Sequence, residues 1–392
     1  MQLSRKGLTV CTIGVTQTLA WASTYYLTAV LADPVSADLH LPRTWFFGAV
    51  SAALLLSGLL GPWAGRLIDR YGGRAVLAAT SVVFAGGLIG LSCAAGPVSL
   101  TAAWLVLGVG MGGGLYEAAF ATAAGLYGRD ARSAITGITL FAGFASTVGW
   151  PTSAFLIGAV GWRGACLAWA LLHLVVGLPL NRLLIPKAPP RAASTPDQSA
   201  RSGVSRTMIV LACVFGVTWF VSASLAAHLP RLLQAMGATQ TAAIAAASLV
   251  GPAQVAARLV EFSLLRRASP MLSARLAVAM HPIGAALLAG FGAPAALAFV
   301  LLHGGGNGLL TIARGTLPLA LFGAEGYGLR TGLIAAPARI LQGAAPLLFG
   351  FVLDRAGPRA ALLFSGTLMA ASLLALLALH VPRQTATAQG RP

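Results

Sequence analysis

The sequence is a succession of apolar runs, each about twenty residues long, separated by short polar or basic segments. A run of about this length, wound as a helix, crosses the ~30 Å hydrocarbon core of a bilayer. The runs predict an all-α polytopic membrane protein with about twelve transmembrane helices. We expect these helices near 8–31, 45–65, 75–95, 99–126, 134–159, 163–185, 207–228, 241–265, 272–291, 294–321, 331–352 and 360–380.

Composition excludes several classes of protein. Only 9% of the residues are charged, whereas soluble domains carry roughly a quarter. The net charge of +17 is a feature of nucleic-acid binders, but here the basic residues lie between apolar runs and form no single stripe. The four cysteines form no CxxC pair, and no P-loop lysine motif or catalytic string occurs. We therefore expect a membrane protein that is no enzyme and has no metal, cofactor or nucleic-acid partner.

Basic residues collect in alternate connections between the predicted helices. By the positive-inside rule, the more basic side is cytoplasmic, which predicts a bacterial inner-membrane protein with both termini in the cytoplasm. We also expect a monomer. The basic side carries Arg5, Lys6, Arg66, Arg70, Arg74, Arg129, Arg132, Arg182, Lys187, Arg191, Arg201, Arg206, Arg266, Arg267, Arg275, Arg330, Arg383 and Arg391, and the opposite side carries Arg43, Arg163, Arg231, Arg355 and Arg359.

The chain divides into two related halves. Residues 186–206 are rich in Pro, Ser, Ala and Arg without apolar periodicity, so we interpret them as a linker between bundles 1–185 and 207–381, with a tail at 382–392. Leu126-Tyr127-Gly128 recurs as Leu321-Phe322-Gly323, and Gly161-Trp162-Arg163 recurs as Gly357-Pro358-Arg359. The interval is about 195 residues in both cases. This repeat predicts two pseudo-symmetric six-helix bundles with a substrate site near the midplane between them.

The segment after the second predicted helix reads Gly65-Arg66-Leu67-Ile68-Asp69-Arg70-Tyr71-Gly72-Gly73-Arg74. It resembles the G-x-x-x-D-R-x-G-x-R loop of the major facilitator superfamily. The resemblance implies secondary transport by alternating access, with Gly65, Asp69, Arg70, Gly72 and Arg74 as a conformational latch. The corresponding segment after the eighth helix, from Phe262 to Pro270, lacks the first glycine and the aspartate. We expect no latch there.

Five arginine and glutamate residues lie deep within the predicted helices: Glu117, Arg258, Glu261, Arg314 and Arg339. A charge at the bilayer centre costs at least ~2.5–3.5 kcal/mol on insertion scales and normally faces a cavity or a partner. Three cations against two anions favour an anionic solute, because a guanidinium offers a planar fork to a carboxylate. We predict that the three arginines bind substrate, and that Glu117 and Glu261 take part in proton coupling.

Structural alternatives stay open for each of these residues. Arg258 and Glu261 are three apart on one helix face, so they can form a neutralising pair. Arg314 and Arg339 can extend to the membrane surface or bind helix ends. Glu117 can simply be paired with one of the arginines.

The depth of Arg258 depends on how the halves are aligned. At an interval near 197 it lies deep in the eighth helix. That placement resembles the substrate-binding arginine of monocarboxylate and oxalate–formate transporters of this superfamily, which implies a carboxylate contact. Aligning Arg258-Leu259-Val260-Glu261 with Arg66-Leu67-Ile68-Asp69 moves Arg258 towards the surface instead.

Further polar and aromatic residues are candidates for the transport path. Trp21 and Tyr25 share a stripe of the first helix, and Gln254 lies one turn before Arg258. His303 and Asn307 are four apart in the tenth helix. We predict that Trp21, Tyr25, Gln254 and Asn307 line the substrate path and that His303 relays protons. The alternatives are aromatic packing and a buried histidine with ordinary hydrogen-bond partners.

Three functions are compatible with these features. Proton symport of a small organic anion, similar to a monocarboxylate, is the leading hypothesis. Proton-antiport efflux of drugs or metabolites is the second. It is disfavoured because the fifth helix reads Gly149-Trp150-Pro151-Thr152-Ser153-Ala154 and lacks the G-P-x-x-G-G-like element of drug antiporters. A non-transporting membrane sensor is the third. It would need an output domain.

Overall fold

The computed structural model describes residues 5–187, 205–265 and 268–379, and the elements in these ranges are helices. Most of the predicted linker and all of the predicted tail lie outside the described residues, as do Arg266 and Arg267. The elements are α1 Arg5–Ser23, α2 Thr28–Asp38, α3 Arg43–Tyr71, α4 Gly73–Ser92, α5 Pro97–Gly114, α6 Tyr116–Tyr127, η1 Gly128–Asp130, α7 Ala131–Ala142, α8 Ala145–Leu172, η2 His173–Gly177, η3 Leu180–Leu184, α10 Arg206–Ala235, α11 Gln240–Ser248, α12 Val250–Ser263, α13 Pro270–Phe291, η5 Ala293–Ala295, α14 Ala296–Phe322 and α15 Tyr327–Ala378.

Nine helical stretches of the described chain are long and apolar enough to cross a membrane. Three predicted crossings account for the difference from twelve. The first is divided between α1 and α2, and the fifth and sixth are joined in the 54-residue stretch Ala131–Leu184. The eleventh is the first part of the 52-residue helix α15, which turns at Gly357. The predicted all-α fold of twelve transmembrane helices is confirmed.

Glycines of positive φ stand at equivalent places in the two halves. Gly128 (φ 54°) and Gly323 (φ 75°) end α6 and α14, and Gly161 (φ 72°) and Gly357 (φ 83°) turn the chain inside α8 and α15. This region of φ strongly favours glycine. The sequence repeat of about 195 residues therefore marks the same backbone turns in both halves.

Several predicted helices are interrupted inside the membrane. The fourth breaks at Leu115, whose backbone is extended (φ −95°, ψ −162°), so Glu117 lies in the first turn of a new helix, α6. The amide of Gln17 donates a hydrogen bond to the freed Gly114 carbonyl at 2.7 Å. A break at this depth is tolerated because a side chain replaces the missing backbone partner. The eighth predicted helix likewise divides into α11 and α12 at Leu249.

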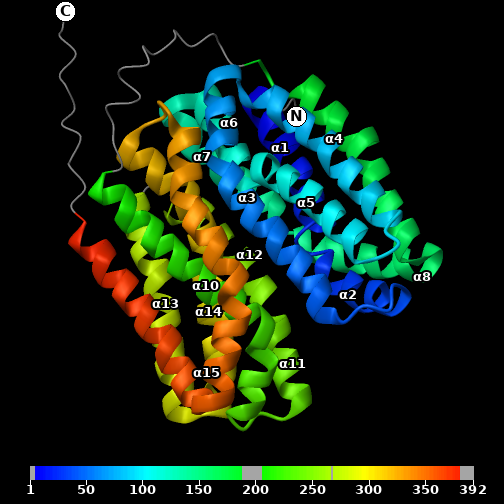
Figure 1. Cartoon of the computed structure of the whole chain (residues 1–392). Coiled ribbons are helices and arrows are strands. Elements are labelled where there is room, and N and C mark those ends of the chain that lie inside the picture. Colours follow the sequence, from blue (N-terminus) through cyan, green and yellow to red (C-terminus); the bar gives the residue numbers. More distant parts are fainter. Residues whose placement is uncertain (1–4, 188–204, 266–267, 380–392) are drawn as a thin grey trace, which may run out of the picture.

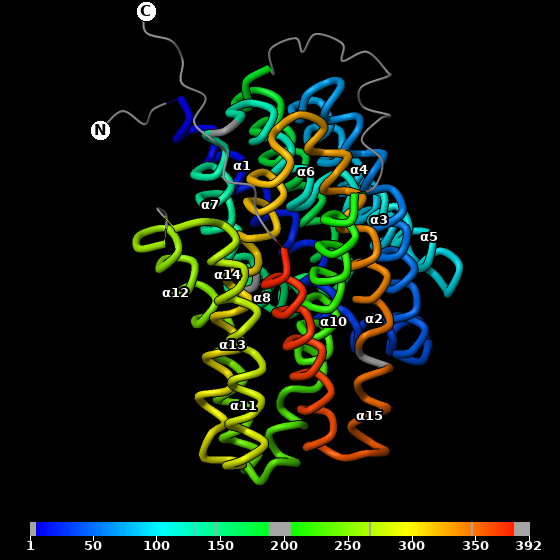
Figure 2. Tube along the Cα trace, turned by 90° about the vertical axis from the view of Figure 1, so that its left-hand side faces the viewer, coloured from blue at the N-terminus to red at the C-terminus, as the bar shows by residue number. Residues whose placement is uncertain are grey.

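Figure 1 shows the two halves side by side, the N-terminal one blue to green and the C-terminal one light green to red. We call the side where α1 begins and α3 ends the terminal face, at the top of Figures 1 and 2. Helices α3, α6 and α7 contact α12, α14 and α15 across the halves. On the opposite face each half has its own ion pair, Arg163 with Asp38 and Arg231 with Asp354.

The halves approach most closely where glycines of α3 and α15 face each other. A Cβ atom on Gly332 would lie 2.7 Å from the carbonyl oxygen of Gly61, and a Cβ atom on Gly65 would overlap the backbone of Gly328. These contacts lie in the parts of α3 and α15 nearest the terminal face. The two halves are therefore closed against each other at the terminal face.

Candidate functional site

Two adjacent pockets lie between the halves. The central pocket has about 460 Å³ of space free of protein atoms, and a side pocket has about 240 Å³. Glu117 and Ala335 line both pockets, and Glu117 is the only carboxylate among the described residues that line either. The central pocket is lined by Tyr116, Glu117, Phe120, Phe215, Trp219, Thr311, Arg314, Pro318, Thr331, Ile334 and Ala335.

Glu117 and Arg339 form an ion pair across the halves. The Arg339 Nη2 atom lies 3.1 Å from Glu117 Oε2, and the side chains are 5% and 24% exposed, respectively. The break at Leu115 favours this arrangement, because a carboxylate in the first turn of α6 interacts well with the helix dipole. Of the alternatives left open by the sequence, the pairing of Glu117 with an arginine is the one observed.

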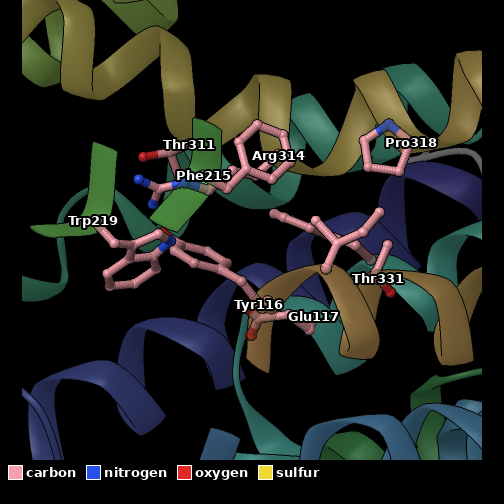
Figure 3. Close-up of a pocket in the computed structure, with 11 residues that line it drawn as sticks. Tyr116, Glu117, Phe215, Trp219, Thr311, Arg314, Pro318 and Thr331 are labelled. Atoms are coloured by element: carbon pink, nitrogen blue, oxygen red, sulfur yellow. The ribbon is translucent and has the colours of Figure 1, made fainter. Parts of the chain in front are cut away.

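Arg314 has only neutral partners. Its guanidinium carbon lies 4.3 Å from the centre of the Trp219 ring, and its Nη2 atom donates to the Thr218 hydroxyl at 3.3 Å. Figure 3 shows the guanidinium beside Trp219 and Thr311, at the pocket. Its Nε atom is buried without a hydrogen-bond partner. Among the described residues no carboxylate lies within ion-pair distance of Arg314, and the nearest acidic group at the pocket, Glu117, is bound to Arg339.

Arg258 does not line the central pocket but contacts Thr311, which does. It is 4% exposed, and its Nη2 atom donates to Gln254 Oε1 and to Thr311 Oγ1, both at 3.3 Å. Thr311 lines the pocket, whereas Arg258 and Gln254 do not. The Nε and Nη1 atoms of Arg258 are buried without partners, and no carboxylate of the described chain pairs with it.

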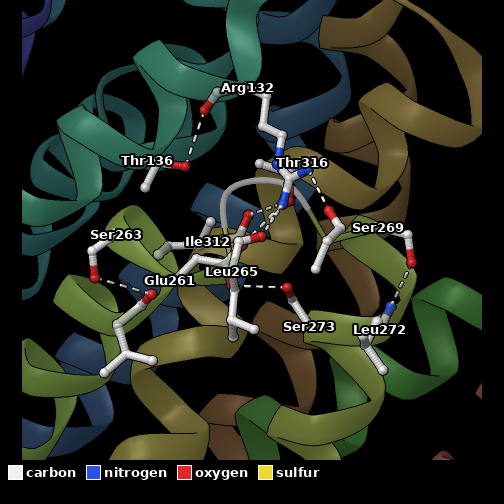
Figure 4. Close-up of polar contacts among 12 residues, drawn as sticks. Arg132, Thr136, Glu261, Ser263, Leu265, Ser269, Leu272, Ser273, Ile312 and Thr316 are labelled. Carbon is white, nitrogen blue, oxygen red and sulfur yellow. Dashed lines mark hydrogen bonds and ion pairs between the residues drawn. The ribbon is translucent and has the colours of Figure 1, made fainter.

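The alternative left open by the sequence, a pair between Arg258 and Glu261, is not observed. Glu261 instead accepts hydrogen bonds from Arg132 Nη2 at 3.2 Å and from Ser273 Oγ at 2.8 Å, as Figure 4 shows. Arg132 lies on α7, in the other half, and also donates to the carbonyl oxygens of Leu265 and Ala268. Sequence spacing puts Arg258 and Glu261 on one face but cannot reveal a competing arginine 126 residues away from Arg258 in the chain.

The pairing of Glu261 with Arg132 also helps to decide between the two alignments of the halves, the one at an interval near 197 and the one that matches Glu261 to Asp69. Asp69 lies two residues before the end of α3, and Glu261 lies two residues before the end of α12. Both carboxylates bind groups of the opposite half. The register that aligns Glu261 with Asp69 therefore describes the helix ends, and it moves Arg258 towards the terminal face. The segment after α12 contacts the other half even though it lacks the glycine and aspartate of the motif.

Asp69 binds the start of α15. Its Oδ1 and Oδ2 atoms accept hydrogen bonds from the backbone N–H groups of Gly328 and Leu329, at 3.0 and 2.9 Å. The first N–H groups of a helix have no partner within the helix and attract a carboxylate. Of the other predicted latch residues, Gly65 abuts Gly328, and Gly72 (φ 80°) follows the last residue of α3. The Arg70 guanidinium lies over the Tyr71 ring, and Arg74 is the second residue of α4.

The chain matches the Major Facilitator Superfamily over residues 13–339. It belongs to this superfamily. It is therefore a membrane transporter and not an enzyme, as the sequence predicted.

A curated relative and two solved structures are also similar to this chain, and the solved structures share its fold. A protein of Thermoproteus tenax described as an "uncharacterized 38 kDa protein in 23S RNA operon" is 32% identical over 334 residues, covering 83% of this chain and 82% of the relative. The human organic anion transporter MFSD10 (TETRAN) has a TM-score of 0.75 at 17% identity, over 96% of this chain and 100% of its own. The E. coli fucose:proton symporter FucP has a TM-score of 0.78 at 14% identity, over 95% and 99%.

His303 and Asn307 of this transporter have partners away from the pockets. The Nδ1 atoms of His303 and His281 are 3.0 Å apart, and His281 Nε2 is 3.2 Å from the Ser365 hydroxyl. Asn307 Oδ1 accepts from the Ser222 hydroxyl at 2.9 Å. Neither residue lines a pocket in the described chain. These hydrogen bonds join α14 to α13, α15 and α10, all within the C-terminal half.

Aromatic residues from both halves meet beside the ion pair. The Trp21 ring centre is 6.4 Å from that of Trp219, at 19°, and 4.9 Å from that of Tyr116. Tyr25 packs edge-on against Trp21 at 5.6 Å. The Arg339 guanidinium lies 4.8 Å from the Trp219 ring centre and 5.8 Å from that of Trp21. Trp21 and Tyr25 therefore adjoin the ion pair, but in the described chain they line neither the central pocket nor the side pocket.

Sequence reasoning missed most of the pocket wall, notably Trp219, Tyr116, Phe120 and Thr311. One of them could have been found. Trp219 follows Trp21 by 198 residues, close to the repeat interval, so the repeat places the two indoles at related positions of the two halves. Tyr116 and Phe120 carry no such signal, because aromatic residues are frequent in any membrane helix.

Replacing Asp69 by Asn is expected to weaken closure of the terminal face. The asparagine side chain is neutral and has one acceptor oxygen in place of two. The hydrogen bonds from the two N–H groups, worth about 1.5–3 kcal/mol each to a charged acceptor, are therefore weakened. Alkylation of a cysteine introduced at Ile68, which is buried in one cluster with Tyr327 of the other half, should be faster by about tenfold or more, since 1.4 kcal/mol is a factor of ten. Equal alkylation rates in both proteins would contradict the latch.

Proposed function

We propose that this transporter moves a small organic anion, of the monocarboxylate type, by proton symport with alternating access. One observation carries the proposal: Arg314 and Arg339 line the pockets between the halves, Arg258 lies behind Thr311 of the pocket wall, and of these three only Arg339 has a carboxylate partner in the described chain. Such an excess of positive charge in a membrane is costly unless a ligand balances it. A carboxylate bound at Arg314 supplies that balance, since guanidinium and carboxylate groups match in geometry.

Two features favour proton coupling through Glu117. It faces both pockets and is held by Arg339 rather than by a permanently buried network. When a substrate carboxylate competes for Arg339, Glu117 loses its counter-charge and takes up a proton. Substrate and proton then cross together. The names of the structural relatives, an organic anion transporter and a proton symporter, are compatible with both parts of this proposal.

For orientation, we propose that the terminal face is cytoplasmic in the bacterial inner membrane, because most of the basic residues belong to that side. The closed contacts between α3 and α15 then shut the cytoplasmic side. In this arrangement the path opens on the opposite side, and release inwards requires the Asp69 and Arg132 contacts to break.

The function is tested by uptake of radiolabelled monocarboxylates into proteoliposomes, with and without an inward proton gradient and after subtraction of protein-free liposomes. We expect uptake of at least one monocarboxylate to be stimulated by the gradient. Transport of neutral solutes alone, with no carboxylate moved in either direction, would contradict the proposal.

Replacing Arg314 by Gln is expected to lower substrate affinity by about ten- to a hundredfold, because a hydrogen bond to a charged group contributes about 1.5–3 kcal/mol. The matched control is Arg359→Gln, since Arg359 is exposed on the opposite face. Equilibrium binding of the transported carboxylate to purified protein measures both. An unchanged affinity in the Arg314 variant would remove this residue from the site.

A further inference from the structure

The walls of the central pocket are aromatic, and its charged groups are few. Tyr116, Phe120, Phe215 and Trp219 contribute four rings to the lining, together with the apolar side chains of Pro318 and Ile334. The Tyr116 and Phe120 rings are stacked, with centres 5.3 Å apart at 16°. A pocket that binds an acid with polar groups on all sides would instead place hydrogen-bond donors on every wall, because each polar group of the ligand loses water on entry.

The charged group is fixed to one of these rings. Arg314 lies on the Trp219 ring at 4.3 Å, and Arg339 lies near the same ring at 4.8 Å. Cation–π contacts of this kind hold a guanidinium in place while its N–H edges stay free. The Nε atom of Arg314 and the Nη1 atom of Arg339 are buried and have no hydrogen-bond partner. A carboxylate can therefore bind at the edge of Arg314 while the rest of the ligand lies against rings.

From these observations, and resting on the proposed organic-anion function, we infer that the substrates are carboxylates with an aromatic body. The substrate carboxylate binds Arg314, and the aromatic ring of the substrate packs against Tyr116, Phe120 and Trp219. Arg314 and the four rings line the same pocket, so one ligand can place its carboxylate at the guanidinium and its ring against the aromatic wall. Aromatic pairs add stabilisation beyond the area that they bury, so a flat ring gains more here than an alkyl chain.

The first test is a binding competition on purified protein with four probes: benzoate, phenylacetate, acetate and the neutral benzamide. We expect benzoate and phenylacetate to bind at least tenfold more tightly than acetate, and benzamide to bind no better than acetate. Equal affinity for acetate and the aromatic acids would overturn this inference and leave the organic-anion function standing. Failure of all three acids to bind, or equal binding of benzamide and benzoate, would overturn both.

The second test uses the ratio of benzoate to acetate affinity in variants. In Trp219→Leu and Phe120→Leu we expect this ratio to fall by about tenfold, whereas Trp219→Phe, which keeps a ring, should retain most of it. The matched control is Trp63→Leu, because Trp63 is 57% exposed on α3 and lines neither pocket in the described chain. Phe120→Leu leaves the Arg314–Trp219 contact in place. An unchanged ratio in both leucine variants, each folded by its thermal unfolding curve, would refute the aromatic wall.

Discussion

Glu117→Gln is expected to abolish substrate accumulation driven by a proton gradient while sparing exchange of labelled for unlabelled substrate. Glutamine has nearly the same shape as glutamate, and its carbonyl oxygen can still accept the hydrogen bond that Arg339 donates at 3.1 Å. It cannot gain or lose a proton in the working range of pH. The substrate can therefore still bind and cross, but no proton accompanies it, and a gradient no longer drives uptake.

The measurement compares gradient-driven uptake with counterflow in the same proteoliposomes. The matched control is Glu325→Gln, since Glu325 is exposed and lines neither pocket of the described chain. We expect the control to accumulate substrate as the native protein does. Full accumulation by the Glu117 variant would exclude it as the proton carrier. Loss of both uptake and counterflow would show a binding role instead.

Thermal stability provides a second test of the Glu117–Arg339 ion pair. Removing one partner of a buried pair costs about 3–5 kcal/mol, because the remaining charge stays desolvated. Arg339 is the more buried partner, so Glu117→Gln leaves the costlier charge uncompensated. A double change, Glu117→Gln with Arg339→Gln, should recover thermal stability relative to either single change if the two side chains act as a pair.

The sequence predicted which residues of the site are charged but not how they pair. Glu117, Arg314 and Arg339 were identified because any charge inside an apolar run is costly, a rule that needs no coordinates. Pairing depends on where helices break and which half they face. Because α6 begins after the break at Leu115, Glu117 lies in its first turn and binds Arg339 of α15. Because α7 packs against α12, Glu261 binds Arg132 rather than Arg258. Neither event follows from spacing along one helix.

The fold was predictable in more detail because its signals are local or repeated. Apolar length gives each crossing, and Gly161 and Gly357 mark the same turn in both halves. The aromatic wall of the central pocket was not predictable, because aromatic residues in membrane helices serve packing as often as binding. The repeat interval relates Trp219 to Trp21, but the contact of its ring with two guanidinium groups is visible only in the structure.

Gly65→Ala is expected to prevent the two halves from closing at the terminal face. A Cβ atom at this position would overlap the backbone carbonyl group of Gly328, and backbone cannot move aside as the end of a side chain does. Overpacking costs about 1–3 kcal/mol, and 1.4 kcal/mol changes a population by a factor of ten. The ratio of closed to open molecules should therefore fall by about tenfold, and transport should slow because alternating access needs this face to close.

The measurement is the distance distribution between spin labels at Tyr71→Cys and Glu325→Cys, in a background without the four native cysteines. Both positions are exposed, at the end of α3 and before the start of α15. The matched control is Gly86→Ala, because a Cβ atom there meets nothing within 4 Å while the gain in helix propensity is the same. We expect longer distances only with Gly65→Ala. Identical distributions in the two variants would mean that the glycine contact does not control closure.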